Sequence, residues 1–242
     1  MLKDTTWLSR TELLIGRTQL EKLMNAHVLV VGMGGVGSFA AEFICRSGVG
    51  EMTIVDGDVV DASNRNRQLP ALVSTQGKSK AEIMAARLND INPELKLNVI
   101  KEFIKPEAVA EILSVKFDYV VDAIDSVSPK LTFIKAAFEK GLPIVSSMGA
   151  GGKMNPTQIQ IADISKSYNC PFAQQVRKQL KQAGIYKGIK VVFSPEENNK
   201  DSLMMTDGAN FKTSAYGTMS YLPAMFGATA ASVVIRDLMK GV

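Results

Sequence analysis

An apolar run at 27–33, in which valine predominates, contains Gly32, and three more glycines, Gly34, Gly35 and Gly37, follow it. Such a run is typical of a strand that is buried on both faces in a parallel sheet. The glycines allow the backbone to turn sharply and to approach a phosphate. The first N–H groups of the helix expected at 38–47 would then favour an anion. The pattern predicts nucleotide binding, but it does not distinguish NAD, FAD and ATP, and a tight turn without a ligand is the alternative.

Charged residues that follow the next apolar run, 51–56, favour ATP among these nucleotides. In a dehydrogenase, Asp56 would hold the ribose hydroxyls of NAD. Beyond it, however, the chain supplies Arg65, Arg67 and Lys80. A triphosphate needs more cationic compensation than the phosphates of a dinucleotide, so these side chains suit ATP better than NAD.

Further carboxylates, Asp122 and Asp125, come at the end of the apolar run 117–122. The C-terminal ends of strands are where open α/β sheets bind their ligands. A carboxylate at that edge can hold Mg²⁺ beside bound phosphates. Arginines, a lysine and such a carboxylate in one crevice indicate phosphoryl or nucleotidyl transfer rather than hydride transfer.

Alternating strand and helix patterns position these residues. One or two short amphipathic helices are expected within 7–25, strands at 27–33, 51–56, 95–100, 117–122 and 142–147, and helices at 38–47, 78–91, 106–113 and 128–140. This alternation predicts right-handed crossovers and an α/β fold with a Rossmann-like, doubly wound parallel sheet.

The rhythm changes after residue 152, where antiparallel strands are expected to join the sheet. Residues 157–163 alternate between apolar and polar, which is typical of an antiparallel strand with one wet face. A helix at 171–181, a strand at 190–193, a mobile loop at 194–212 and a buried helix at 223–239 follow. The uncharged run 213–235 is long enough to span a bilayer, but its Gly, Pro, Ser and Thr content makes membrane insertion the weaker interpretation. We expect a single domain, 1–242, with a nucleotide-binding half at 1–150 and a substrate and dimer side at 151–242.

Composition limits the cellular setting and the partners. The chain has 242 residues, of which 46% are hydrophobic and 21% charged, so it can bury a core. The two cysteines form no Cys-x-x-Cys pair, so we expect no zinc site. No apolar signal-peptide segment opens the chain, and a cytoplasmic location is expected. A net charge of +4 permits an anionic partner such as RNA without requiring one.

Together the motifs resemble the E1-like ThiF/MoeB/HesA superfamily of ATP-dependent adenylating enzymes. They are Gly32-x-Gly-Gly-x-Gly37, Asp56-x-Asp58, Ser63-Asn-x-x-Arg-Gln68, Lys80, Asn92-Pro93 and Asp122-x-x-Asp125. The resemblance runs from about Ser9 to the C-terminus. Within the superfamily the chain is most similar to the tRNA threonylcarbamoyladenosine dehydratase branch. The segments that carry this are Asn64-Arg-Asn-Arg-Gln68, Asp122-Ala-Ile-Asp-Ser126, Gly149-Ala-Gly-Gly152 and Pro156-Thr-Gln-Ile-Gln160.

The resemblance implies a role for each matching residue. The four glycines would surround the ATP phosphates, Asp56 would take the ribose with Asp58 beside it, and Arg67 would stabilise charge as pyrophosphate leaves. Lys80 would contact the phosphates and Asp125 would position Mg²⁺. Ser63, Asn64 and Ser126 would complete the ATP contacts. Arg10 matches an arginine that one subunit lends to its neighbour's site, which implies a homodimer.

The sequence departs from the sulfur-carrier activators of this superfamily. Those proteins usually hold zinc through two Cys-x-x-Cys pairs and often use a downstream cysteine for thioester or persulfide chemistry. Here Cys170 is the only cysteine in the second half, and we interpret it as structural; Cys45 is expected in the core. Basic residues near the 171–181 helix, Arg177, Lys178 and Lys181, are candidates for contact with tRNA phosphates, and a merely solvated helix face is the alternative.

The resemblance therefore implies ATP-dependent dehydration, a ring closure, of N6-threonylcarbamoyladenosine in tRNA through an acyl-adenylate. This route needs no enzyme nucleophile, which agrees with the cysteine count. The alternative is an adenylyltransferase that activates the C-terminus of a ubiquitin-like sulfur carrier. An NAD-dependent oxidoreductase, or a nucleotide-binding scaffold without turnover, is a third possibility. A cysteine desulfurase partner and a monovalent cation, Na⁺ or K⁺, near Gly149 are left open.

Overall fold

A computed structural model describes residues 5–206 and 214–241. Within these residues the main sheet has the strand order β3-β2-β1-β4-β5-β7-β6, and a separate pair is formed by β8 and β9. The main strands are β1 (His27–Val31), β2 (Glu51–Val55), β3 (Lys96–Ile100), β4 (Tyr119–Asp122), β5 (Ile144–Ser147), β6 (Gln160–Asp163) and β7 (Lys190–Phe193). All neighbouring pairs are parallel except β6 with β7. The order reverses between β1 and β4, the point at which open α/β sheets bind ligands.

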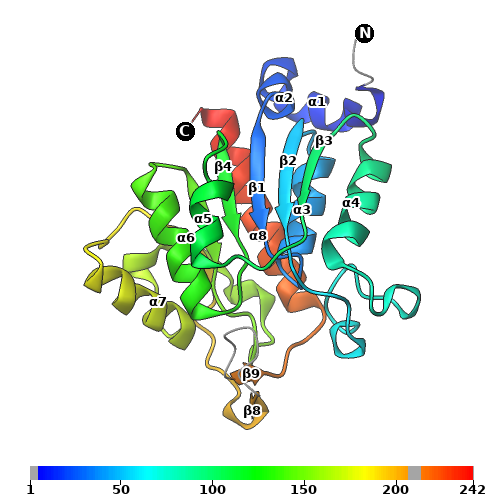
Figure 1. Ribbon diagram of the computed structural model, residues 1–242. Helices are drawn as coiled ribbons and strands as arrows, with labels where there is room; N and C mark the ends of the chain where they lie inside the picture. The colour runs from blue at the N-terminus through cyan, green and yellow to red at the C-terminus, as the bar shows by residue number, and fades with distance from the viewer. Residues whose placement is uncertain (1–4, 207–213, 242) are drawn as a thin grey trace.

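Helices cover both faces of the sheet (Figure 1). They are α1 (Ser9–Ile15), α2 (Arg17–Met24), α3 (Gly37–Arg46), α4 (Lys80–Ile91), α5 (Pro106–Ile112), α6 (Val127–Glu139), α7 (Pro171–Gln182) and α8 (Tyr221–Lys240). Strand β1 is covered by helices on both faces of the sheet, because all five of its residues are buried. Val28 and Val30 pack with residues of α3, α4 and α8, whereas Leu29 and Val31 pack with residues of α5, α6 and α7. The valine-rich run therefore occupies the centre of the molecule, as its pattern predicts.

The N-terminal helices lie at the edge of the sheet where the strands begin (Figure 1). Leu8, which is 3% exposed, fixes this placement. A Cβ on Gly48, just before β2, would come within 2.8 Å of the Leu8 side chain. The glycine-rich turn follows the opposite end of β1. A five-residue strand spans roughly 17 Å, so α1 and the turn are well separated in one chain.

One expectation for the C-terminal half is corrected. Part of the predicted mobile loop is the strand β8 (Leu203–Met205), which pairs antiparallel with β9 (Ser214–Tyr216) in a segment for which no strand was predicted. Residues 207–213 lie outside the described part, so the loop prediction is untested there. The expectation failed because the exposed, methionine-rich strand β8 lacks the buried alternation that signals a strand. Strand β7 pairs parallel with β5 and antiparallel with β6, so the antiparallel strands expected in this half are β6 at the edge of the main sheet and the separate β8–β9 pair.

The uncharged C-terminal run forms the expected buried helix. Helix α8 is long and apolar enough to cross a membrane, with a hydropathy of 1.3, yet 56% of its apolar window is buried inside the molecule. A Cβ on Gly227 would come within 2.4 Å of the Val36 carbonyl oxygen, so α8 approaches the backbone of the glycine-rich turn closely. Packing against the turn and α3 accounts for this burial.

Candidate nucleotide-binding site

The glycine-rich turn joins β1 to α3 at the C-terminal edge of the sheet. Gly32 has φ +92° and no room for a Cβ, which would lie 2.9 Å from the Ala123 carbonyl oxygen. A Cβ on Gly37 would meet the Gly32 carbonyl oxygen at 1.7 Å. Gly34 differs, because a Cβ there would meet nothing closer than the Gln68 amide at 3.7 Å. The fold requires glycine at positions 32 and 37, whereas the space at Gly34 is free for a ligand.

Alanine at these positions is expected to separate folding from ligand binding. Gly34→Ala should leave the thermal unfolding temperature close to wild type. It should weaken ATP binding by about tenfold, because the methyl group would occupy the space in which the phosphates are expected. Gly37→Ala should fail to fold stably because its Cβ overlaps a backbone oxygen. Calorimetric ATP titration with a thermal melt measures both. A Gly34→Ala protein that binds ATP as tightly as wild type would show that phosphate does not approach this residue.

Asp56 comes directly after β2, and backbone amides hold its carboxylate in place. Oδ2 accepts the Met33 N–H at 2.6 Å and Oδ1 accepts the Asp58 N–H at 2.7 Å. Burial raises the pKa of Asp56 and these two hydrogen bonds oppose the rise. Because Met33 belongs to the glycine-rich turn, the same bond fixes the carboxylate beside the turn, where a ribose would lie.

Lys80 opens α4 and is buried, at 4% exposed. Its Nζ lies 3.0 Å from Oδ2 of Asp58 in an ion pair, and its backbone N–H bonds the Asp58 carbonyl, also at 3.0 Å. The structure thus brings Lys80 and Asp58 together, as expected for two residues of one site. The pair is a charge-assisted hydrogen bond between a buried ammonium and a partly exposed carboxylate.

Arg67 lies in the loop between β2 and α4, half-buried and pointing along that loop. Its Nη1 donates to the Ser63 carbonyl at 3.0 Å and to Oδ1 of Asn66 at 2.9 Å. Burial lowers the pKa of this guanidinium and the negative charge of Asp125 opposes the change, so the two residues lie close enough to interact. Asn64 instead closes the short helical turn Ala62–Asn64 with Asp61.

Asp125 is exposed on the turn between β4 and α6, next to buried Ser126. The Ser126 hydroxyl lies 3.4 Å from Oδ1 of Asp125. Among the described residues, no group of three or more His, Cys, Asp or Glu could hold a metal ion by itself. Mg²⁺ is commonly bound by one or two carboxylates together with substrate phosphates, so a single exposed aspartate beside an arginine fits that ion.

Arg10 is separated by the fold from the residues around the glycine-rich turn within one chain. It is exposed and belongs to α1, and α1 lies at the edge of the sheet where the strands begin (Figure 1). Its neighbours Leu13 and Leu14 are 83% and 84% exposed. Apolar side chains this exposed on an ordered helix are typical of a surface that another protein covers.

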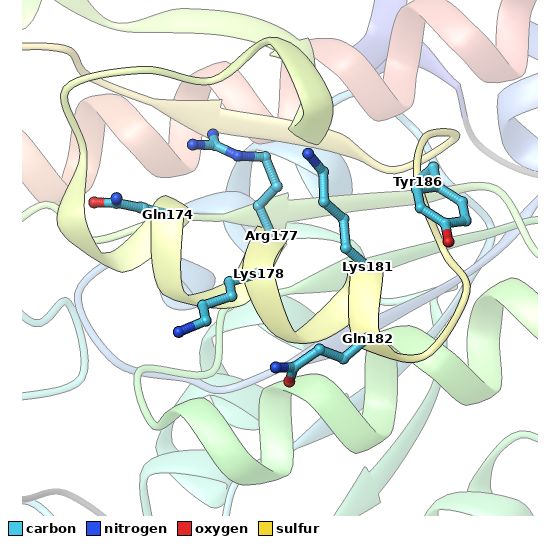
Figure 2. A pocket seen from close by; sticks show the side chains of 6 residues that line it. All are labelled: Gln174, Arg177, Lys178, Lys181, Gln182 and Tyr186. Carbon is cyan, nitrogen blue, oxygen red and sulfur yellow. The ribbon is translucent and has the colours of Figure 1, made fainter.

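The three predicted nucleic-acid contacts, Arg177, Lys178 and Lys181, lie on α7 and border an open hollow of about 550 Å³ (Figure 2). Arg177 and Lys181 point to one side of the helix in this view, and Lys178 points to the other. The Arg177 side chain is held by hydrogen bonds within the chain, because Nη1 donates to both the carbonyl and the hydroxyl of Ser167 at 2.5 Å. Lys178 and Lys181 are exposed, and no ion pair is formed by either in the part of the chain that the structure describes.

Side chains that the sequence reasoning gave no role also border the crevice. The Gln68 amide lies beside Gly34, and its Oε1 is buried without a hydrogen-bond partner among the described residues. Asn198 lies beside the 149–152 loop, donating to the Gly151 carbonyl at 3.3 Å, and its Oδ1 is also buried without a partner there. The position of Gln68 directly after Arg67 was a usable signal, whereas Asn198 had none because it comes from a distant loop.

Both cysteines are buried. Cys45 packs in the core, where burial raises the pKa of its thiol to about 12. Cys170 is 4% exposed and precedes α7. Cys45 therefore lies in the core, as expected. A buried thiol with a raised pKa is also a poor nucleophile.

Comparisons with known proteins agree with this geometry. The chain matches the ThiF family over residues 8–241. The tRNA threonylcarbamoyladenosine dehydratase of Bacillus subtilis is 42% identical over 97% of this chain and 95% of that protein. The crystal structure of the Escherichia coli dehydratase, TcdA, in complex with ATP superimposes with a TM-score of 0.90 at 37% identity, covering 99% of this chain and 97% of that one. Its complex with AMP gives a TM-score of 0.89 at 38% identity, covering 98% and 95%. By contrast, the adenylyltransferase and sulfurtransferase UBA4 of Lodderomyces elongisporus is 32% identical over 64% of this chain and only 34% of that protein.

Proposed function

The chain belongs to the ThiF family, and from this we propose that it is an ATP-dependent dehydratase that closes a ring in N6-threonylcarbamoyladenosine of tRNA. One observation carries the substrate assignment. The similarity to a dehydratase runs along the full length of both chains, whereas the similarity to a sulfurtransferase is partial. The enzyme acts on cytoplasmic tRNA.

The reaction has two steps that share one site. The carboxylate of the modified base attacks the α-phosphorus of ATP, the bond to the β-phosphate oxygen breaks, and pyrophosphate leaves. A nucleophilic atom of the same modified base then attacks the activated carbonyl carbon, closes a ring and releases AMP. The water that is lost leaves as the oxygen carried away on AMP and two protons. No enzyme nucleophile is required, which suits a chain whose cysteines are both buried.

The protein supplies position and charge for these steps. The space at Gly34 admits the phosphates, the amide-held Asp56 binds the ribose, and Lys80 and Arg67 balance the charge that develops on the leaving pyrophosphate. Asp125 would hold Mg²⁺, which when bound neutralises phosphate charge. Asn198 Oδ1 and the loop carbonyls beside it offer oxygen ligands to a monovalent cation. In the proposed homodimer, Arg10 reaches the site of the second subunit. The second subunit in turn covers the exposed Leu13 and Leu14.

Which substrate triggers AMP release tests the function. The protein is incubated with ATP and either tRNA carrying threonylcarbamoyladenosine or a ubiquitin-like sulfur carrier. AMP should form only with the tRNA, and the modified nucleoside should become lighter by one water in mass spectrometry. AMP release that depends on the carrier alone would establish the sulfur-carrier alternative instead.

Lys178 and Lys181 are proposed to contact tRNA phosphates, because both are exposed and border the hollow on α7. Replacing either with alanine should weaken tRNA binding and lower the slope of log affinity against log salt by about 0.7–0.9, the value for one phosphate contact. ATP affinity should stay unchanged. Lys96→Ala, an exposed lysine on β3 at the far edge of the sheet, is the matched control. Equal salt slopes in all three variants would mean that this helix face is only solvated.

A further inference from the structure

Lys130, on helix α6, is completely buried. Its ammonium lies against the C-terminal ends of β4 and β5, at the edge of the sheet that borders the crevice. Lys130 and Asp122 are both fully buried, and Nζ lies 2.6 Å from Oδ2 of Asp122. The ammonium also donates to the Ser146 hydroxyl at 3.2 Å and to the Ser147 carbonyl at 3.0 Å. The Ser146 hydroxyl in turn donates to Oδ2 of Asp122 at 2.6 Å. Three acceptors use all three N–H groups of the ammonium, so the network is complete.

Stability alone does not account for this ion pair. Removing two charges from water is costly, and well-packed apolar residues of similar volume are often as stabilising or more so. The next positions on the same face of α6 include Ile134, which belongs to the apolar core. Core stability alone is therefore a weak reason for an ion pair at this position.

The network joins two segments that border the crevice. The other oxygen of Asp122, Oδ1, accepts the Ile124 N–H at 3.0 Å and so shapes the turn that presents Asp125. Ala123 of this turn lies against Gly32, which leaves no room for a Cβ between them. On its other side, Lys130 holds the Ser147 carbonyl, which ends β5 just before the 149–152 loop.

Two more contacts extend the same link. The Lys130 ammonium lies 5.8 Å from the ring centroid of Phe172, in the first turn of α7. Phe172 in turn lies close to Gly149, where a Cβ would be 3.5 Å from the Phe172 Cβ. Burial lowers the pKa of Lys130, and the charges of Asp122 and Asp125 oppose this change. Lys130 is thus connected to the Asp125 turn, the Gly149 loop and the start of α7.

We propose that Lys130 is a positioning residue, which fixes the Asp125 turn relative to the Gly149 loop so that Asp125 meets Mg²⁺ and the ATP phosphates correctly. This inference rests on the proposed adenylation site. It adds a residue that does not itself touch the nucleotide. The expected signature of its loss is a changed Mg²⁺ dependence of ATP binding, rather than a loss of fold.

The test uses variants that keep the core filled. In Lys130→Met with Asp122→Asn, both charges are removed and the side-chain volumes are nearly kept. This protein should unfold close to the wild-type temperature. The Mg²⁺ concentration needed for half-maximal ATP affinity should rise about tenfold, as measured by calorimetry, and AMP formation should slow on the order of tenfold. Lys135→Met, a partly exposed lysine on the same helix, should change neither quantity.

A second variant covers the case in which the double variant does not fold. Ser146→Ala keeps the ion pair but removes a hydrogen bond to each partner, and a smaller shift in the same direction is expected. If the folded double variant keeps the wild-type Mg²⁺ dependence, the network has only a structural role and Lys130 does not position Asp125. The same conclusion follows from Ser146→Ala if only that variant folds. Because ATP binding is measured without tRNA, this result is independent of whether the tRNA or the carrier protein is the substrate.

Discussion

Replacing Arg67 with alanine is expected to slow AMP formation on modified tRNA by a hundredfold or more, about 2.7 kcal/mol of transition-state stabilisation. The guanidinium is half-buried and fixed by the Ser63 carbonyl and the Asn66 side chain. A charge that is already oriented stabilises the departing pyrophosphate without further reorganisation. Single-turnover measurements at saturating ATP report this step. Asp125→Ala should lose activity by a similar factor.

Arg65 provides the control for Arg67. It lies in the same loop, is exposed, and its Nε donates to the Ala62 carbonyl at 3.2 Å. Arg65→Ala removes the same charge from the loop and should cost much less activity. If Arg67→Ala closes the ring at the wild-type rate, or if both arginine variants fall equally, the role given to Arg67 is wrong and only a diffuse charge effect remains.

The parts of the site that could be predicted from the sequence are those coded by adjacent residues. Gly32 and Gly37 are needed because a neighbouring backbone leaves no room for a Cβ, and the strand and helix patterns on either side locate the turn. Asp56 follows from the end of a strand, since parallel strands present their C-terminal ends at one edge. The arginines and the lysine beyond Asp56 favour ATP over NAD without any resemblance, but assigning tRNA required the family resemblance, because charged residues alone do not identify a substrate.

The parts that could not be predicted depend on contacts between distant residues. Lys130 lies in a helical pattern where a lysine normally reads as solvent-exposed, because lysine is almost never fully buried without a partner. Its partners Ser146 and Ser147 belong to another strand. Arg177, a candidate for contact with tRNA phosphates, donates to Ser167, a contact between segments that the sequence pattern does not show. The β8–β9 pair likewise lacks a buried face to mark it.

Mixing two inactive variants should restore activity if Arg10 serves the neighbouring subunit. Arg10→Ala damages the partner's site, whereas Arg67→Ala damages the chain's own site. A mixed dimer then holds one intact site, made from the Arg67 of one chain and the Arg10 of the other. With random exchange at equal amounts, half of the dimers are mixed, so activity should return to about one quarter of wild type. Subunits are exchanged by co-expression with two affinity tags, and AMP formation is measured on the mixture.

A mixture of Arg67→Ala and Asp125→Ala separates this explanation from simple recovery on mixing. Both residues belong to the same chain's site and interact with each other, so a mixed dimer of these variants has no intact site and should stay inactive. The exposed Leu13 and Leu14 give an independent check, because replacing both with serine should weaken the dimer and lower activity at dilute protein. Recovery in both mixtures, or none in either, would be incompatible with an arginine lent across the interface. Helix α1, which carries Arg10, lies at the edge of the sheet where the strands begin, so Arg10 would then have no route to the chemistry.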